Sequence, residues 1–252
     1  MILLRVRRAV TLGIALALCI LHYWRRRLRG PIPLEQRALW LQRSAARVLR
    51  SLGIEWRIEG VPPSCGLVVS NHLSYLDIPI ISAAMPCFFV AKMEIAVWPI
   101  FGKAARSGGT IFLDRSSLES AMSVADQMAE RLKLHVPVVL FPEGTSTDGA
   151  QVLRFHARLI DPATSTGTPI SPAAIRYLLH DGVEERELCW YGDESFVTHL
   201  WKVLGVRSFS AHLCFGEPRI YTDRRVAADE TRAWIAAWRQ AHLQEVQPAE
   251  TK

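Results

Sequence analysis

Hydrophobic positions recur along this chain with two spacings, one typical of helices and one typical of strands. Residues 9–24 form an apolar stretch between two arginine clusters. Apolar residues then fall at positions 34, 38, 41, 45, 48 and 52, in steps of four and three. Such steps place apolar side chains on one face of a helix, and Pro33 and Gly53 suit its two ends. We therefore predict an amphipathic helix over residues 34–52.

After residue 53, short apolar runs alternate with helical patterns. The runs predict strands at residues 54–59, 66–70, 87–91, 110–113, 136–141, 169–177, 187–191 and 209–215. The helical patterns cover residues 75–84, 116–133 and 229–246, the second opening with the capping box Ser116-x-x-Glu119. This alternation predicts an α/β fold, a single domain with a mostly parallel central sheet flanked by helices and preceded by N-terminal membrane-associating helices. We divide the chain into an anchor segment (1–30), an amphipathic helix (31–53) and a main domain (54–247).

The composition is that of a folded domain without a disulfide framework. Of the 252 residues, 50% are hydrophobic and 21% are charged, which excludes a disordered chain. None of the five cysteines belongs to a CxxC pair. A disulfide framework or a zinc site is therefore not expected, and we expect reduced thiols in a cytoplasmic body.

The excess of positive over negative charge lies in the N-terminal segment. The chain carries a net charge of +6, and residues 1–30 hold seven arginines and no acidic residue. The remainder has 23 basic and 24 acidic residues, a net charge of −1. Because the excess charge does not belong to the main domain, we expect no nucleic-acid partner and predict contact with a membrane surface.

The apolar stretch at 9–24 favours an anchor at the membrane. It is shorter than the ~20 residues that a spanning helix needs, and it ends in Tyr23 and Trp24, which suit the headgroup region. We expect an uncleaved re-entrant or interfacial anchor, with a short span, a cleaved signal peptide or a buried helix as alternatives. The basic faces of the 34–52 helix could likewise lie on anionic lipid, while its apolar stripe packs on the main domain.

A histidine and an aspartate follow the strand predicted at 66–70. The segment 71–77 reads Asn-His-Leu-Ser-Tyr-Leu-Asp. His72 suits a general base, and a carboxylate such as Asp77 can orient its ring. On a helix their spacing would separate the side chains by about 140°, and on a strand it would put them on opposite faces. The two can therefore meet only where the chain changes direction, as it does at a strand-to-helix turn.

The spacing alone is a weak signal, because His156 and Asp161 repeat it. That second copy lacks both the preceding strand and the asparagine, and we treat it as coincidence. A helix-capping or buried polar pair is the alternative interpretation of His72 and Asp77.

Two further strand ends carry polar residues. Residues 109–115 read Gly-Thr-Ile-Phe-Leu-Asp-Arg, so Arg115 could hold a phosphate, with a surface ion pair as the alternative. Residues 141–145 read Phe-Pro-Glu-Gly-Thr, where Gly144 permits a tight turn and Glu143 could orient a substrate hydroxyl. In the alternative interpretation this is an ordinary turn. Residues 168–173, Thr-Pro-Ile-Ser-Pro-Ala, indicate only a turn or an edge strand on their own.

Taken together, these four segments resemble the 1-acylglycerol-3-phosphate (lysophosphatidate) acyltransferase family, which includes lyso-ornithine lipid acyltransferases. The resemblance covers about residues 60–180, with the segments in the family's order. It implies an acyltransferase domain over 54–247 that moves a fatty acyl group from acyl-CoA or acyl-carrier protein to the free hydroxyl of a membrane lysolipid. It implies neither a metal nor another cofactor, and a place at the cell's inner membrane with the catalytic domain on the cytoplasmic side.

The resemblance also implies roles for individual residues. His72 would be the general base and Asp77 would orient and polarise it. Asn71 would belong to the substrate site, and Arg115 would bind the acceptor phosphate. The remaining acceptor-site residues would be Glu143, Gly144 and Thr145.

Two departures leave the acceptor open between lysophosphatidate and lyso-ornithine lipid. Many phosphatidate-forming members have an arginine after the Phe-Pro-Glu-Gly-Thr segment, where this chain has Ser146. Residues 190–201, rich in aromatic side chains, resemble a segment of members that acylate lyso-ornithine lipid; an interfacial aromatic helix is the alternative. A non-catalytic lipid-binding relative and a thioester hydrolase remain as hypotheses from other functional classes.

Overall fold

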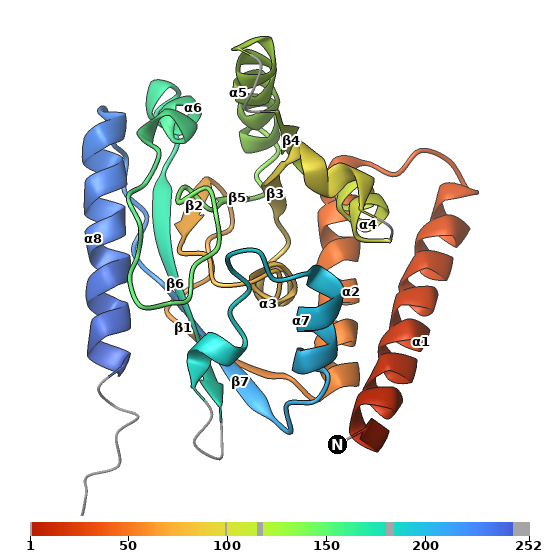
Figure 1. The fold of residues 1–252 in the computed structure, drawn as a ribbon. Coiled ribbons are helices and arrows are strands. Elements are labelled where there is room, and N and C mark those ends of the chain that lie inside the picture. Colours follow the sequence, from red (N-terminus) through yellow and green to blue (C-terminus); the bar gives the residue numbers. More distant parts are fainter. Residues whose placement is uncertain (1, 99, 115–117, 180–183, 244–252) are drawn as a thin grey trace, which may run out of the picture.

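A seven-stranded sheet forms the centre of the molecule (Figure 1). The structure is a computed structural model and describes residues 2–98, 100–114, 118–179 and 184–243. Its strands are β1 (Glu55–Glu59), β2 (Leu67–Ser70), β3 (Phe88–Lys92), β4 (Ile111–Leu113), β5 (Val138–Leu140), β6 (Ile170–Leu179) and β7 (Phe209–Phe215). They lie in the order β1-β7-β6-β2-β5-β3-β4. Neighbouring strands run parallel except β6 and β7, which are antiparallel. The predicted α/β fold with a mostly parallel sheet is confirmed.

Helices cover both faces of this sheet. They are α1 (Ile2–Arg27), α2 (Leu34–Leu52), α3 (Asp77–Ala84), α4 (Phe101–Gly108), α5 (Leu118–Leu132), α6 (Asp161–Ser165), α7 (Phe196–Val203) and α8 (Arg224–Leu243), with the short 3₁₀ helices η1 (Met93–Val97), η2 (Ala157–Leu159) and η3 (Glu185–Glu187). Alternate residues of the central strand β2 enter different cores. Val68 packs in the core that includes α3 and α7, while Leu67 and Val69 pack in the core that includes α5, α6 and α8. Because β2 is central and buried on both faces, three of its four residues are apolar and all four are buried.

Most predicted elements are present, but one strand is absent and one helix begins earlier than predicted. The helix over 34–52 has the predicted bounds, ending at Gly53 in the left-handed conformation. The strand predicted at 187–191 is wrong, because the chain there leaves η3 as a turn and loop instead of joining the sheet. The helix predicted from 229 begins earlier, at Arg224, because Asp223 accepts the first main-chain N–H groups, those of Arg225 and Val226, at 2.6 and 3.1 Å. Helices α4 and α6 were not predicted, and the capping box at Ser116 lies outside the described residues.

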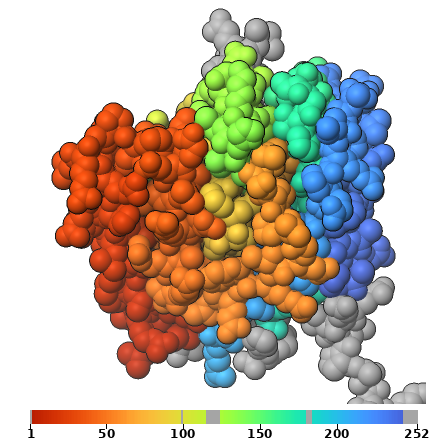
Figure 2. Space-filling view, turned by 180° about the vertical axis from the view of Figure 1, so that it is seen from behind, coloured from red at the N-terminus to blue at the C-terminus, as the bar shows by residue number. Residues whose placement is uncertain are grey.

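Helices α1 and α2 form a hairpin along one side of the molecule, opposite α8 (Figure 2). The indole of Trp40 donates to the Cys19 carbonyl at 3.2 Å, and the Thr11 hydroxyl donates to the Ser51 carbonyl at 3.1 Å. Away from α2, α1 exposes large apolar side chains, namely Ile2, Leu3, Val6, Val10, Ile14, Leu18, Ile20, Leu21 and Trp24. In the stretches of chain that the structure describes, no helix is both long enough and apolar enough to cross a bilayer.

Candidate active site

His72 and Asp77 meet at the turn between β2 and α3. Strand β2 ends at Ser70 and α3 begins with Asp77. The change of chain direction brings His72 Nδ1 within 2.7 Å of Asp77 Oδ2. Since Nδ1 faces the carboxylate, Nε2 is the nitrogen left for a substrate proton. The ring is partly exposed, with 21% of its side chain accessible, whereas the Asp77 side chain is fully buried.

Asp77 receives three further hydrogen bonds inside the protein. The main-chain N–H groups of Leu73 and Ser74 donate to Oδ2 at 2.8 and 3.1 Å, and the Tyr177 hydroxyl donates to Oδ1. Burial and the neighbouring Asp77 carboxylate raise the pKa of Tyr177 well above its usual value, so its hydroxyl stays a donor. These donors compensate for burying a carboxylate away from water.

Glu143 supports the main chain around the histidine. Its Oε1 accepts the His72 N–H and its Oε2 accepts the Leu153 N–H, each at 2.8 Å. Burial raises the pKa of Glu143, while the two N–H groups oppose that rise. The carboxylate thus ties the loop after β5 to the His72 turn. A direct contact with a substrate hydroxyl, as predicted, would have to compete with these bonds.

The side chain of Phe141 limits how far the His72 ring can rotate. The two rings stack with centroids 4.1 Å apart and planes inclined by 16°. Gly144 then turns the chain at φ 75°, its N–H donating to the Phe141 carbonyl at 3.1 Å. This turn leaves Thr145 exposed beside it.

Asn71 joins β2 to β6. Its amide donates to the Ile175 carbonyl at 3.0 Å and accepts from the Ile175 N–H at 2.9 Å. The side chain is buried and both ends of its amide are bonded to main chain, so it continues the strand pairing beyond Ser70. Arg115 lies outside the described residues, and its role at an acceptor phosphate stays a prediction.

The residues that position Tyr177 beside Asp77 were not predicted from the sequence. Glu185 Oε1 accepts the Tyr177 N–H at 2.7 Å, and Glu185 Oε2 lies 2.8 Å from Arg239 Nη2. The same buried guanidinium donates to the carbonyls of Ile175 and Gly149 at 2.6 and 2.7 Å. Strand alternation places Tyr177 on the same face of β6 as Ile175, but nothing in the local sequence links it to Asp77.

An aromatic cluster lies next to the His72 turn. Trp190 donates its main-chain N–H to the Leu73 carbonyl at 2.8 Å. Tyr75 contacts the rings of Trp190, Phe196 and His199, with centroids 4.8 to 5.8 Å apart. The Tyr75 hydroxyl also lies 3.0 Å from His199 Nδ1. Helix α7 thus brings the aromatic segment noted in the sequence against the strand-to-helix turn.

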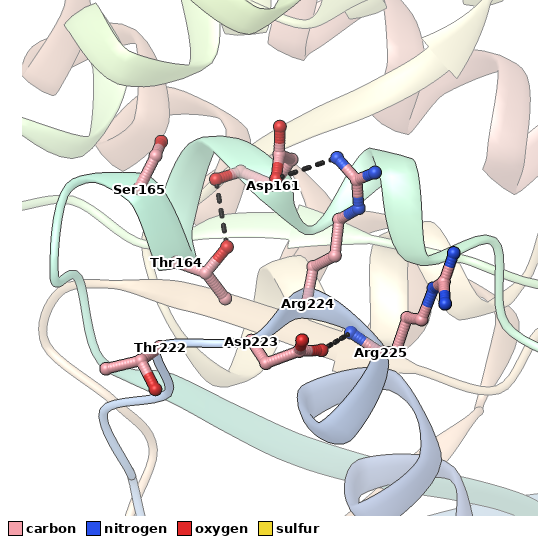
Figure 3. Close-up of a pocket in the computed structure, with 7 residues that line it drawn as sticks. All are labelled: Asp161, Thr164, Ser165, Thr222, Asp223, Arg224 and Arg225. Atoms are coloured by element: carbon pink, nitrogen blue, oxygen red, sulfur yellow. Dashed lines mark hydrogen bonds and ion pairs between the residues drawn. The ribbon is translucent and has the colours of Figure 1, made fainter.

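Two surface cavities lie on other parts of the chain. One, of about 380 Å³, is lined by Arg186, Glu187, Cys189, Tyr191, Gly192, Asp193, Glu194 and Lys202. The other, of about 370 Å³, lies beside α6 and the start of α8 (Figure 3). There Arg224 points toward Asp161, with Nη1 and Oδ1 3.0 Å apart. The second His-x₄-Asp copy therefore forms no matching pair, since His156 is exposed and Asp161 bonds to Arg224.

The chain matches one known family over its central part. The profile of the family described as "Acyltransferase" matches residues 55–176. A protein of Pseudomonas aeruginosa named lyso-ornithine lipid O-acyltransferase is 36% identical over 83% of this chain and 80% of its own length. A protein of the same name from Rhodobacter capsulatus is 36% identical over 75% of this chain and 70% of its own length.

Two further matches are named as acyltransferases that act on 1-acylglycerol-3-phosphate. The 1-acyl-sn-glycerol-3-phosphate acyltransferase of Neisseria meningitidis serogroup B is 30% identical over 69% of each chain. The crystal structure of the 1-acyl-sn-glycerophosphate acyltransferase PlsC from Thermotoga maritima superposes with a TM-score of 0.66 and 18% identity, covering 100% of this chain and 98% of that one. At that identity the superposition shows a shared fold.

Proposed function

The chain belongs to the acyltransferase family, and on that premise we propose that it transfers a fatty acyl group from a thioester to the free hydroxyl of a lysophospholipid such as 1-acylglycerol-3-phosphate. The observation that carries the proposal is the partly exposed His72 ring, bonded through Nδ1 to the buried Asp77 at 2.7 Å. This arrangement is that of a general base whose second nitrogen can reach a substrate.

The reaction then proceeds by direct transfer. As Nε2 of His72 takes the hydroxyl proton, the acceptor oxygen attacks the thioester carbonyl carbon, and Asp77 stabilises the resulting imidazolium. The tetrahedral intermediate collapses, the carbon–sulfur bond breaks, and the thiolate takes the proton from His72. The thioester is already activated, so the enzyme's main contribution is to position the two reactants.

A nucleophilic cysteine is not part of this scheme. Burial raises the pKa of the Cys87 and Cys189 thiols, which keeps both protonated. Direct transfer requires no covalent acyl-enzyme, no metal and no bound cofactor. Acyl-CoA or acyl-carrier protein serves as the second substrate.

Lyso-ornithine lipid is the second candidate acceptor. Ser146 occupies the position where many phosphatidate-forming members have an arginine, and its hydroxyl donates to the Trp190 carbonyl. The two relatives with 36% identity bear the name lyso-ornithine lipid O-acyltransferase. An acceptor without phosphate would explain an uncharged side chain at this position.

Purified enzyme supplied with labelled acyl-CoA and each acceptor in turn separates these candidates. Turnover of 1-acylglycerol-3-phosphate supports the first candidate, and turnover of lyso-ornithine lipid alone supports the second. Acyl release with neither acceptor would identify a thioester hydrolase instead and contradict both.

Replacing His72 tests the chemistry itself. We expect His72→Ala to lower kcat by about 10²–10⁴-fold, the usual contribution of a general base, while acceptor binding is largely retained. His156→Ala is the matched control, because His156 has the same spacing to an aspartate but is exposed and does not pair with it. Full activity in His72→Ala would eliminate the proposed mechanism.

We place the enzyme at the inner membrane, with its catalytic domain on the cytoplasmic side. A lysolipid acceptor resides in a membrane, and α1 combines an exposed apolar surface with flanking arginines. Such a helix suits the boundary between headgroups and acyl chains, where basic residues meet anionic lipid.

A further inference from the structure

A second group of polar side chains lies at the β1 edge of the sheet, under the last turns of α8. In the register of β1 and β7, Glu59 is opposite Cys214. His212 lies two residues earlier on β7, so its side chain is on the same face as that of Cys214. Helix α8 crosses this face and contributes Trp238 and His242, which stack with ring centroids 4.1 Å apart.

Three of these residues converge on one point. The Nε2 of His212 lies 3.0 Å from a carboxylate oxygen of Glu59. Glu59, His212 and His242 each offer one atom that could bind a metal ion, and these three atoms lie within 4.8 Å of one another. The two imidazole rings are nearly perpendicular, at 86°, with centroids 5.5 Å apart. Modest rotation of these side chains would bring all three atoms to the bond lengths of a metal ion, about 2.0–2.2 Å.

The ring of His242 is oriented by a hydrogen bond to its own helix. His242 Nδ1 lies 2.8 Å from the Trp238 carbonyl, an acceptor only, so Nδ1 is the donor there and Nε2 is the nitrogen left to face a metal ion.

The donor set selects the kind of metal. Two imidazoles and one carboxylate suit Zn²⁺ and similar divalent transition metals, whereas Ca²⁺ and Mg²⁺ require more oxygen ligands. Arg57 and Arg176 flank His212 in the sheet register. The guanidinium of Arg176 is directed to the His242 carbonyl. Two neighbouring cations weaken the attraction for a metal, so we expect moderate affinity.

We propose that Glu59, His212 and His242 form a binding site for Zn²⁺ or a similar divalent transition metal. The ligands come from the edge strand β1, its neighbour β7 and the end of α8. The bound ion fastens that end of the helix to the edge of the sheet. Because its ligands are separate from the His72 turn, the site does not depend on the proposed acyl transfer.

Calorimetric titration of the full chain, free of any histidine tag and stripped of metal, tests the site with ZnCl₂ alone. We expect one ion per chain. We expect binding to weaken by at least about tenfold in Glu59→Gln, His212→Asn and His242→Ala, a loss typical even for residues that only support a ligand. His156→Ala, at an exposed histidine elsewhere, should bind as the parent does.

A second measurement guards against variants that fold poorly. Zn²⁺ should raise the melting temperature of the parent chain and of His156→Ala, because the ion binds the folded state. It should leave that of Glu59→Gln unchanged, and Glu59 is exposed enough for this variant to fold. No Zn²⁺ binding in the parent, or binding that survives all three ligand variants, would overturn the proposal.

Discussion

A single carboxylate, that of Asp77, shows what individual residues contribute to this enzyme. It is fully buried and accepts from an imidazole, two main-chain N–H groups and a phenol. Each donor stabilises the charge, and together they leave the carboxylate one orientation. The orientation of His72 follows from it, because the ring is bonded on one edge and stacked on Phe141.

The Tyr177 hydroxyl can be tested separately from the packing of its ring. Tyr177→Phe keeps the ring and removes one hydrogen bond to a charged group, an interaction of about 1.5–3 kcal/mol. We expect turnover to fall by about tenfold or more. With one donor fewer, Asp77 holds the protonated imidazole more strongly, so the acid limb of the pH–rate profile should move to higher pH.

The control for this prediction is Tyr191→Phe. The Tyr191 hydroxyl accepts from Arg186 at 3.2 Å at an exposed site. A merely structural role for Tyr177 would lower activity without moving the pH profile. An unmoved profile would therefore contradict the positioning role.

At the scale of elements, helix α8 supports the candidate active site from the side of β6. Arg239 on this helix pairs with Glu185 and bonds to main chain of β6 and of the loop at Gly149. The buried pair thus connects three segments that are distant in sequence. Its geometry sets where β6 presents Tyr177 to Asp77.

Breaking this pair should destabilise the whole domain. Arg239→Ala leaves the largely buried Glu185 without its ion-pair partner, and we expect a loss of about 3–5 kcal/mol in the free energy of unfolding. Arg219→Ala, which removes an exposed pair with Glu230 at 3.8 Å, should cost less than about 1 kcal/mol. Urea denaturation measures both, and equal losses would contradict this account.

On the scale of the whole molecule, charge and apolar surface are segregated. The seven arginines of residues 1–30 account for the net charge of +6, and the outer surface of α1 is apolar. The rest of the chain is close to neutral. This asymmetry favours one orientation of the enzyme on an anionic surface.

Vesicle flotation measures the binding to anionic vesicles that this asymmetry predicts. Replacing Arg25, Arg26 and Arg27 with serine should weaken binding to phosphatidylglycerol vesicles by about 3 kcal/mol, or roughly 100-fold, at about 1 kcal/mol per arginine. Added salt should weaken binding by the parent chain in the same direction.

A matched control variant removes the same number of positive charges from another part of the chain. Serine at Arg219, Arg224 and Arg225 removes three positive charges near the start of α8. Binding that depends on net charge alone would fall equally in both triple variants. Such a result would contradict a role for the N-terminal segment in particular.

The sequence by itself determined the alternation of strands and helices, the bounds of α2, and the position of His72 at a strand-to-helix turn. These are local properties, because apolar spacing, prolines and glycines act over a few neighbouring residues. The same reasoning failed at residues 187–191. A short apolar pattern there is consistent with a strand, but the pattern does not specify which strand it would pair with.

Only the tertiary structure decided what surrounds Asp77 and which residues gather under α8. Tyr177 lies 100 residues from Asp77, and the contacts of β1 with β7 and α8 join chain segments still further apart. Such contacts depend on strand order and helix packing, which local patterns do not encode. The chain thus carries its proposed catalytic pair in one short segment, while the support for that pair exists only in the folded molecule.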